Sequence, residues 1–255
     1  MMKSLSERLN SIKDGWDQAA TEDAIHYILG SKCKRDLDLK TFLDLKAKQA
    51  EEDTADFFRQ MDFIPSGKRM LDIGCWIGGI TRYFSEVFAE AHGVDISEEM
   101  VKKARELNND KQHLHFKTIN GFDLSPYEDS FFDFCFSFAT FQYCPSEIVI
   151  QNCFREIARV LKPRGLFKAQ LDGRRWITSR TAIPIYRPLY NFLRNSYFLT
   201  VFGRLITDSI TVRAYRGMAI SWKTVVDILR ALPFKDITIT GENTSHMWVS
   251  GRKAG

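Results

Sequence analysis

The residues best suited to chemistry form an acidic, glycine-rich run with a second acid at a set distance from it. The run is Asp72-Ile73-Gly74-Cys75-Trp76-Ile77-Gly78-Gly79, and Asp95 follows its first glycine by about twenty residues. A carboxylate that ends the next strand at this distance past a glycine turn can accept hydrogen bonds from both hydroxyls of a ribose. The pattern therefore predicts a cofactor that contains a nucleoside.

The glycine turn also indicates what the cofactor lacks. It does not contain the G-x-G-x-x-G pattern that lets backbone approach a dinucleotide pyrophosphate, and the chain has no G-x-x-x-x-G-K-[ST] phosphate loop. A nucleoside cofactor without phosphate fits better, and S-adenosylmethionine is the common one.

Alternating strands and helices are expected to position these residues. An apolar run at 70–73 breaks into the glycine turn and is followed by an amphipathic stretch at 80–88, which predicts strand, turn and helix. Further strands are expected at 90–96, 113–118, 132–137 and 166–171, with helices at 97–107 and 147–161, the latter ended by Lys162-Pro163-Arg164-Gly165. Ligands of such sheets bind beyond the carboxyl ends of the strands, where Asp72, Asp95, 120–123, 137–143 and Asp172 fall.

The end of the chain defines the edge of the sheet. A helix is expected at 221–232 and strands at 236–241 and 246–251, and the four residues between these strands are too few for a parallel crossover. The N-terminal 60 residues repeat apolar side chains at helical spacing. We therefore predict an α/β fold: a doubly wound, Rossmann-like, seven-stranded sheet, mostly parallel with an antiparallel terminal hairpin strand.

Composition limits the class of protein. The chain has 255 residues, of which 44% are hydrophobic and 27% charged, as in ordinary globular proteins. It has no apolar run of membrane-spanning length and no apolar secretory stretch at its start. Its five cysteines form no C-x-x-C and no zinc-like cluster with histidine, so we expect reduced thiols, a cytoplasmic location and no metal.

Positive charge is concentrated in one segment. The whole chain carries +4, but residues 174–216 contain eight arginines, no lysine and one acid, for a net charge of +7. The segment is also rich in tyrosine and phenylalanine. It could bind an anionic or aromatic small molecule, contact an anionic membrane surface or grip RNA, or form a solvated helical cap whose aromatic rings pack on the sheet.

Four runs together resemble the class I S-adenosylmethionine-dependent methyltransferases, in the type 11/25-like subgroup that acts on small molecules. They are 71–79, 93–100, 131–137 and 159–165, in the family's order and spacing over about 65–173. The stretch with Trp16, His26 and Tyr27 resembles the helical lid of a bacterial subgroup. The resemblance implies a helical lid at 1–64, a cofactor-binding core at 65–173, a basic aromatic acceptor cap at 174–216 after the fifth strand, and the end of the core at 217–255.

The resemblance also implies a set of cofactor-binding residues. Asp72, Gly74 and Gly78 would shape the pocket for the methionine portion, to which Cys75 and Trp76 would contribute backbone, and Asp95 would hold the ribose. The remaining positions would surround the adenine and the sulfonium: Ile96 and Met100 flanking the adenine, Asn120, Gly121 and Phe122 at its edge, and Ser137 and Phe138 near the sulfonium. The product would be S-adenosylhomocysteine.

Methyl transfer from a sulfonium is a direct displacement, so the protein mainly has to align the acceptor and exclude water. We expect the acceptor atom to be the oxygen, or the nitrogen, of a small molecule. Candidate general bases are Tyr143, Asp172, His26 and His246, of which Tyr143 is better suited to orient the acceptor because a tyrosine pKa near 10 makes a poor base. The acceptor is expected to contact Tyr27, Tyr143, Arg174, Arg175 and Trp176.

Two departures from the family pattern leave other functions open. Trp76 stands where the family has its second glycine, and Gly121 stands where it has an acid, with Asp123 two residues on as a possible substitute. If Trp76 blocked the cofactor, the chain would be a catalytically silent binding protein. An RNA-modifying methyltransferase that uses the arginines is the third hypothesis, less favoured than an anionic, aromatic or lipid-like small molecule, and we expect no DNA.

Overall fold

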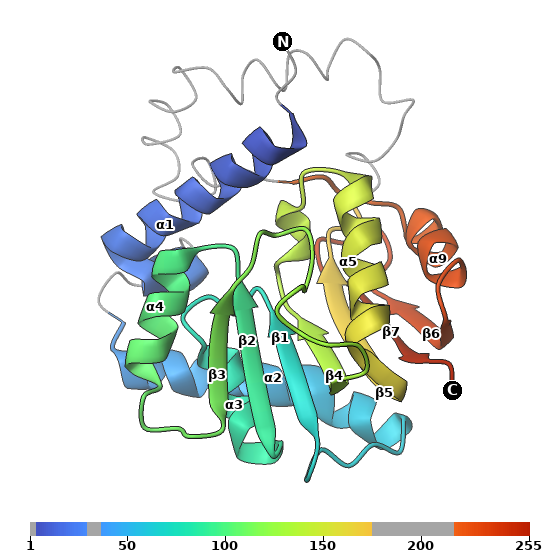
Figure 1. Cartoon of the computed structure of the whole chain (residues 1–255), viewed down its shortest axis with the longest axis horizontal. Coiled ribbons are helices and arrows are strands. Elements are labelled where there is room, and N and C mark those ends of the chain that lie inside the picture. Colours follow the sequence, from blue (N-terminus) through green and yellow to red (C-terminus); the bar gives the residue numbers. More distant parts are fainter. Residues whose placement is uncertain (1–3, 30–36, 175–216) are drawn as a thin grey trace.

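The computed structural model describes residues 4–29, 37–174 and 217–255, in which seven strands form one sheet. The strands lie in the order β3-β2-β1-β4-β5-β7-β6 (Figure 1). Their bounds are β1 Arg69–Ile73, β2 Glu90–Asp95, β3 Leu114–Thr118, β4 Phe132–Ser137, β5 Leu161–Leu171, β6 Phe234–Thr240 and β7 Met247–Lys253. The first five pair in parallel, whereas β7 is antiparallel to both β5 and β6. The predicted fold class is confirmed.

Helices cover both faces of the sheet. They are α1 Leu5–Leu29, α2 Leu39–Gln60, α3 Gly79–Val87, α4 Glu98–Leu107, α5 Glu147–Val160 and α9 Trp222–Arg230, with a short 3-10 helix, η1, at Phe141–Tyr143. Side chains of α2, α3 and α4 pack on one face, and side chains of α5 and α9 pack on the other. Ser97 caps α4 as predicted, because its hydroxyl accepts a hydrogen bond from the Met100 N–H at 3.0 Å.

β4 lies in the middle of the two core layers. Phe134 and Phe136 face the α2 and α3 layer, and Cys135 faces the α5 layer. All three are essentially inaccessible to solvent. An almost unbroken apolar run is the pattern expected of a parallel strand that is buried on both faces.

The start of β5 differs from the sequence prediction. The run Lys162-Pro163-Arg164-Gly165 was expected to separate helix from strand, but β5 begins at Leu161, directly after α5. Phe132 pairs with Leu161 and Phe134 with Leu166, so the extra residues of β5 are accommodated as an irregularity in the ladder, with Arg164 at φ +66°. The turn-forming residues therefore lie within the strand.

The two N-terminal helices occupy different places. α2 is part of the core, since Phe57 and Phe58 pack with Phe134. α1 crosses above the carboxyl ends of the central strands (Figure 1). It is interrupted at Asp23, whose φ and ψ are −169° and 87° and whose carboxylate caps the last turns by accepting from the His26 N–H at 3.0 Å. Within the described residues, no helix has both the length and the apolar character that a membrane crossing requires.

The aromatic packing around Phe134 predicts a large loss of stability when this ring is removed. Phe134→Ala should lower the free energy of unfolding by about 3–5 kcal/mol, because it removes the ring and leaves a cavity between β4 and α2. Urea denaturation followed by circular dichroism measures this. Ile148→Ala, at a side chain that is 61% exposed, is the control and should change stability by less than about 0.5 kcal/mol. Equal effects of the two variants would contradict the assigned core.

Candidate functional site

A pocket lies at the carboxyl ends of the parallel strands, beneath α1. It holds about 800 Å³ of empty space, its open mouth included. Its wall comes from five places in the chain: α1, the β1–α3 turn, the end of β2, the segment after β3, and the segment from Thr140 into α5. Most of the lining side chains are apolar, and the carboxylates among them are those of Asp95, Asp123 and Glu156.

The β1–α3 turn approaches its neighbours closely. Gly74 has φ +80°, and a Cβ built on it would lie 1.9 Å from Oγ1 of Thr140, so a side chain has no room there. Trp76 has φ +52°, in the left-handed region that favours glycine. The chain thus keeps a glycine-like backbone at position 76 while placing an indole in the pocket wall.

Asp95 is the buried carboxylate of the pocket. Its two oxygens accept hydrogen bonds from the Trp76 N–H at 3.0 Å and from the Ser97 N–H at 2.9 Å. Burial raises the pKa of Asp95 to about 6, and these backbone donors oppose the shift. At neutral pH the carboxylate is ionised, and each oxygen retains a lone pair for a further donor.

Asp72 lies outside the pocket lining, at the end of β1 before the glycine turn. Its carboxylate accepts a hydrogen bond from the Thr81 hydroxyl at 2.7 Å, which connects β1 to α3. Burial raises the pKa of Asp72 to about 7, a hydrogen bond from Thr81 opposes this, and the charge of Asp95 adds to it. Asp72 therefore shapes the turn from beneath and does not line the pocket among the described residues.

The segment after β3 forms a second wall. Asn120 turns back on its own loop, where its side-chain oxygen accepts from the N–H of Phe122 at 2.8 Å and of Asp123 at 3.0 Å. Gly121 has φ +76°, and a Cβ there would lie 2.6 Å from Ile96. Hydrogen bonds from Asn120 and Ser125 lower the pKa of Asp123, so this lining carboxylate stays ionised.

α1 forms the roof of the pocket, and its adjacent residues Trp16 and Asp17 fasten it on two sides. The indole of Trp16 meets the ring of Tyr143 edge-on, with centroids 5.2 Å apart. On the other side, Asp17 accepts from the Ser97 hydroxyl at 2.6 Å and from the Glu99 N–H at 3.2 Å. Partial burial acts to raise the pKa of Asp17, but hydrogen bonds from Lys13 and Ser97 outweigh it and lower this pKa. The contact between Asp17 and Ser97 is therefore made by an ionised carboxylate.

Besides Asp72 and Asn120, five further predicted cofactor residues lie outside the pocket lining. Met100 and Cys75 are buried in the core, and burial raises the pKa of the Cys75 thiol well above its ordinary value. The Ser137 hydroxyl donates to the carbonyl of Ile73 at 2.8 Å, and Phe138 meets the Trp76 ring edge-on at 6.3 Å. Gly78 precedes α3 with φ +80°.

The predicted acceptor and base residues are spread out. Tyr143 lines the pocket, whereas Asp172 and His26 do not among the described residues. Asp172 is paired with Arg174, whose Nε lies 2.8 Å from Oδ1. His26 is buried in the last turn of α1, and neither ring nitrogen has a hydrogen-bond partner within the described part of the chain.

The other predicted acceptor contacts and the remaining candidate base, His246, lie away from the pocket lining or outside the described residues. Tyr27 donates to Glu22 near the surface, and His246 is exposed beside Ser245. Arg175 and Trp176 lie outside the described residues.

The described chain resumes at Gly217, beside Tyr143. The Gly217 N–H donates to the carbonyl of Gln142 at 2.9 Å, and the Met218 N–H donates to that of Cys144 at 3.1 Å. The Ile220 N–H donates to the carbonyl of Asp172 at 2.8 Å. The described chain therefore resumes next to Tyr143 and Cys144, which line the pocket, and Ile220 connects it to Asp172 at the end of β5.

Several lining residues were not predicted from sequence. They include Leu9, Ile12, Cys144, Val149, Cys153 and Glu156. The helical spacing of Leu9, Ile12 and Trp16 was a usable signal for the roof, because these side chains share one face of α1. Asp17, which fastens the roof, carried no such signal, since its partners Ser97 and Glu99 are far from it in the chain.

Comparisons with known proteins agree with this geometry. Residues 71–169 match the methyltransferase domain family. The chain is 30% identical over 176 residues to squalene methyltransferase 1 of Botryococcus braunii, covering 68% of this chain and 41% of that protein. It is 26% identical over 206 residues to 2-methyl-6-phytyl-1,4-hydroquinone methyltransferase of Synechocystis sp., covering 76% of this chain and 62% of that one. The chain thus spans about half the length of these relatives.

A solved structure shares the fold. Magnesium protoporphyrin IX methyltransferase from Synechocystis, with bound S-adenosylhomocysteine, superposes with a TM-score of 0.59 at 14% identity, over 95% of this chain and 98% of that one. The domain match, the relatives and this fold lead to one assignment. The chain belongs to the class I S-adenosylmethionine-dependent methyltransferase family.

Proposed function

We propose that this chain transfers the methyl group of S-adenosylmethionine to an oxygen, or a nitrogen, of a small-molecule acceptor by direct displacement. The observation that carries the proposal is Asp95, a buried carboxylate at the end of β2 that lines an apolar pocket and retains acceptor capacity. Family membership indicates the cofactor class, and the apolar pocket with its buried carboxylate is suited to bind a nucleoside cofactor.

The pocket residues fit the cofactor part by part. Asp95 would accept from both ribose hydroxyls, and Ile96 and Phe122 would flank the adenine. Asp123, which is ionised and lines the pocket, would accept a hydrogen bond from the exocyclic amine of the adenine. It would thereby replace the acid that the family has at the position of Gly121. The backbone of the turn from Gly74 to Trp76 would hold the methionine portion.

The acceptor side is formed by α1 and η1. S-adenosylmethionine supplies an electrophilic methyl group on its sulfonium. The protein then has to hold an acceptor atom in line with that group and exclude water. The rings of Trp16 on α1 and Tyr143 in η1 would serve both purposes, because they line the pocket and contact each other. We propose that Tyr143 orients the acceptor. Asp172 is a weaker candidate base because its carboxylate is engaged by Arg174.

The lining favours an apolar or aromatic acceptor. The apolar side chains of the lining include Leu9, Ile12, Trp16, Phe141 and Val149. The named relatives are a squalene and a phytyl-hydroquinone methyltransferase, which also suggests a lipid-like molecule. We propose that the basic, aromatic 174–216 segment, which is followed by Gly217 beside Tyr143, contributes binding of an anionic or aromatic part of the acceptor.

A catalytically silent binding protein is the second candidate, and Trp76 is the observation that favours it. Its indole lines the pocket close to the position proposed for the methionine portion. It is only 8% exposed and packs against Phe138, with the ammonium of Lys46 5.1 Å from its ring centroid. In this alternative the ring occupies the space that the cofactor needs.

Cofactor binding should raise the unfolding temperature of the purified chain. At about 100 times the dissociation constant, S-adenosylmethionine or S-adenosylhomocysteine adds about 2.7 kcal/mol, which corresponds to a shift of about 5–11 °C. NAD is the control and should give no shift, because the turn lacks the pyrophosphate pattern. The sample must first be shown by mass spectrometry to contain no bound cofactor.

Trp76→Gly separates the two candidates. If the wild type shows no shift and this variant does, the indole blocks the cofactor and the silent protein is correct. If both bind, methyl transfer is tested with methyl-labelled cofactor against quinol, sterol-like and phosphobase acceptors. Labelled RNA that is bound at low salt and lost as salt rises would instead support the RNA-modifying alternative.

The raised pKa of Asp95 predicts a pH-dependent affinity. Protonation of this group, with a pKa of about 6, removes the charged acceptor of the ribose hydroxyls, so affinity falls as the pH is lowered through that value. The dissociation constant of S-adenosylhomocysteine should rise about tenfold between about pH 8 and about pH 5. Isothermal titration calorimetry across that range measures it.

Two variants control this experiment. Asp95→Asn should bind more weakly at about pH 8 and lose the pH step, since the amide does not titrate. Asp123→Asn should keep the step, because Asp123 has a lowered pKa and stays ionised throughout. An unchanged step in Asp95→Asn would show that another group controls binding.

A further inference from the structure

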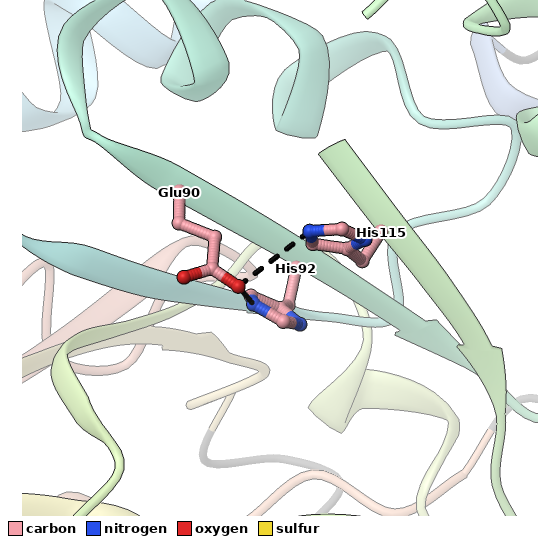
Figure 2. A group of neighbouring side chains, drawn as sticks. All are labelled: Glu90, His92 and His115. Carbon is pink, nitrogen blue, oxygen red and sulfur yellow. Dashed lines mark hydrogen bonds and ion pairs between the residues drawn. The ribbon is translucent and has the colours of Figure 1, made fainter. Parts of the chain in front are cut away.

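A cluster of two histidines and one glutamate lies at the opposite end of the sheet from the pocket. Glu90 and His92 are on β2, and His115 is on β3 (Figure 2). The parallel register pairs His92 directly with His115, and Glu90 lies two residues before His92, so all three side chains share one face. Their ligand atoms all lie within 4.8 Å of one another.

We propose that Glu90, His92 and His115 bind a divalent transition metal ion of the zinc type. Two imidazole nitrogens and one carboxylate oxygen form a common ligand set for Zn²⁺, whereas Mg²⁺ and Ca²⁺ prefer oxygen alone. The sequence did not suggest this site, because its histidines are far apart in the chain and no cysteine belongs to it.

The distances suit a tetrahedral ion. Oε1 of Glu90 lies 2.8 Å from Nε2 of His92 and 3.5 Å from Nε2 of His115. Ligands that bind zinc tetrahedrally at about 2.0–2.1 Å lie about 3.3 Å from one another. Small side-chain rotations would therefore bring all three atoms to bonding distance without movement of the strands.

The surroundings hold two of the ligands in place. The ring of His92 is enclosed by Tyr127, Phe131 and Phe132, with centroids 5.2–5.6 Å away. Nε of Arg69 lies 3.0 Å from Oε2 of Glu90, which orients the carboxylate and leaves Oε1 directed at the histidines. Outer partners of this kind orient metal ligands in known sites.

The third ligand leaves the site open. The side chain of His115 is 45% exposed, so an ion can enter from solvent and a water molecule can complete the coordination. β3 is an edge strand that pairs only with β2. An ion bound by His115, Glu90 and His92 would connect β3 to β2 and so stabilise the edge of the sheet. It would not contact the pocket, because the cluster lies at the other end of the strands.

The test is zinc binding by the full chain with its thiols kept reduced. Equilibrium dialysis with zinc chloride should give one ion that is lost in His115→Ala, with magnesium chloride as the control for oxygen-only sites. His113→Ala is the matched variant: it removes an exposed histidine just before β3 that is outside the cluster, and it should bind as the wild type does. Zinc at about 100 times its dissociation constant should also raise the unfolding temperature by about 5–11 °C, except in His115→Ala.

Glu90→Gln provides a second variant with almost unchanged shape. It should weaken zinc binding at least about tenfold, since the amide replaces a charged ligand. Circular dichroism spectra that match the wild type confirm that both cluster variants are folded. Zinc bound equally well by His115→Ala and Glu90→Gln would place the ion at the cysteines or elsewhere and overturn the proposal, as would the absence of zinc binding by the wild type.

Discussion

The arrangement of the pocket depends on the way one buried carboxylate is satisfied. Asp95 would be costly to bury without partners, and it obtains them from the backbone of two different elements, the β1–α3 turn and the start of α4. These hydrogen bonds set the turn and the helix at fixed positions around the end of β2. Ser97 extends the arrangement to the roof, because its hydroxyl donates to Asp17 of α1. Asp95, directly and through Ser97, thus connects the β1–α3 turn, the start of α4 and α1.

Trp76 shows how this constraint limits the sequence. Its N–H must point at Asp95, and the backbone that achieves this lies in the left-handed region at φ +52°. Glycine would adopt that conformation without strain, whereas tryptophan incurs a cost that its buried packing against α1 and Phe138 offsets. The same residue therefore fixes one carboxylate oxygen of Asp95 and, with its indole, narrows the pocket beside it.

The parallel sheet separates two chemical environments. At the carboxyl ends of the strands, turns and helix N-termini surround an apolar cavity that contains few carboxylates. At the amino ends, the β2–β3 register brings Glu90, His92 and His115 together on one face. The two places share no residue, so the two proposed roles are separate. These roles are ligand binding at the carboxyl ends and attachment of the edge strand β3 at the amino ends.

The sequence by itself determined the order of strands and helices, the cap at Ser97, the terminal hairpin and the position of the acid that ends β2. These depend on local periodicity, on turn-forming residues and on short spacings, which act within a few residues of one another. The start of β5 was predicted wrongly, because Lys162-Pro163-Arg164-Gly165 has the composition of a turn but pairing with β4 draws it into the strand as an irregularity.

Only the tertiary structure decided which distant residues meet. It placed Trp16 against Tyr143, Asp17 against Ser97 and His115 beside His92, and none of these pairs has a spacing that marks it in the chain. Each contact depends on how helices pack on the sheet or on which residues adjacent strands align. These are long-range choices, made by burial of the whole core, so local patterns in the sequence do not contain them.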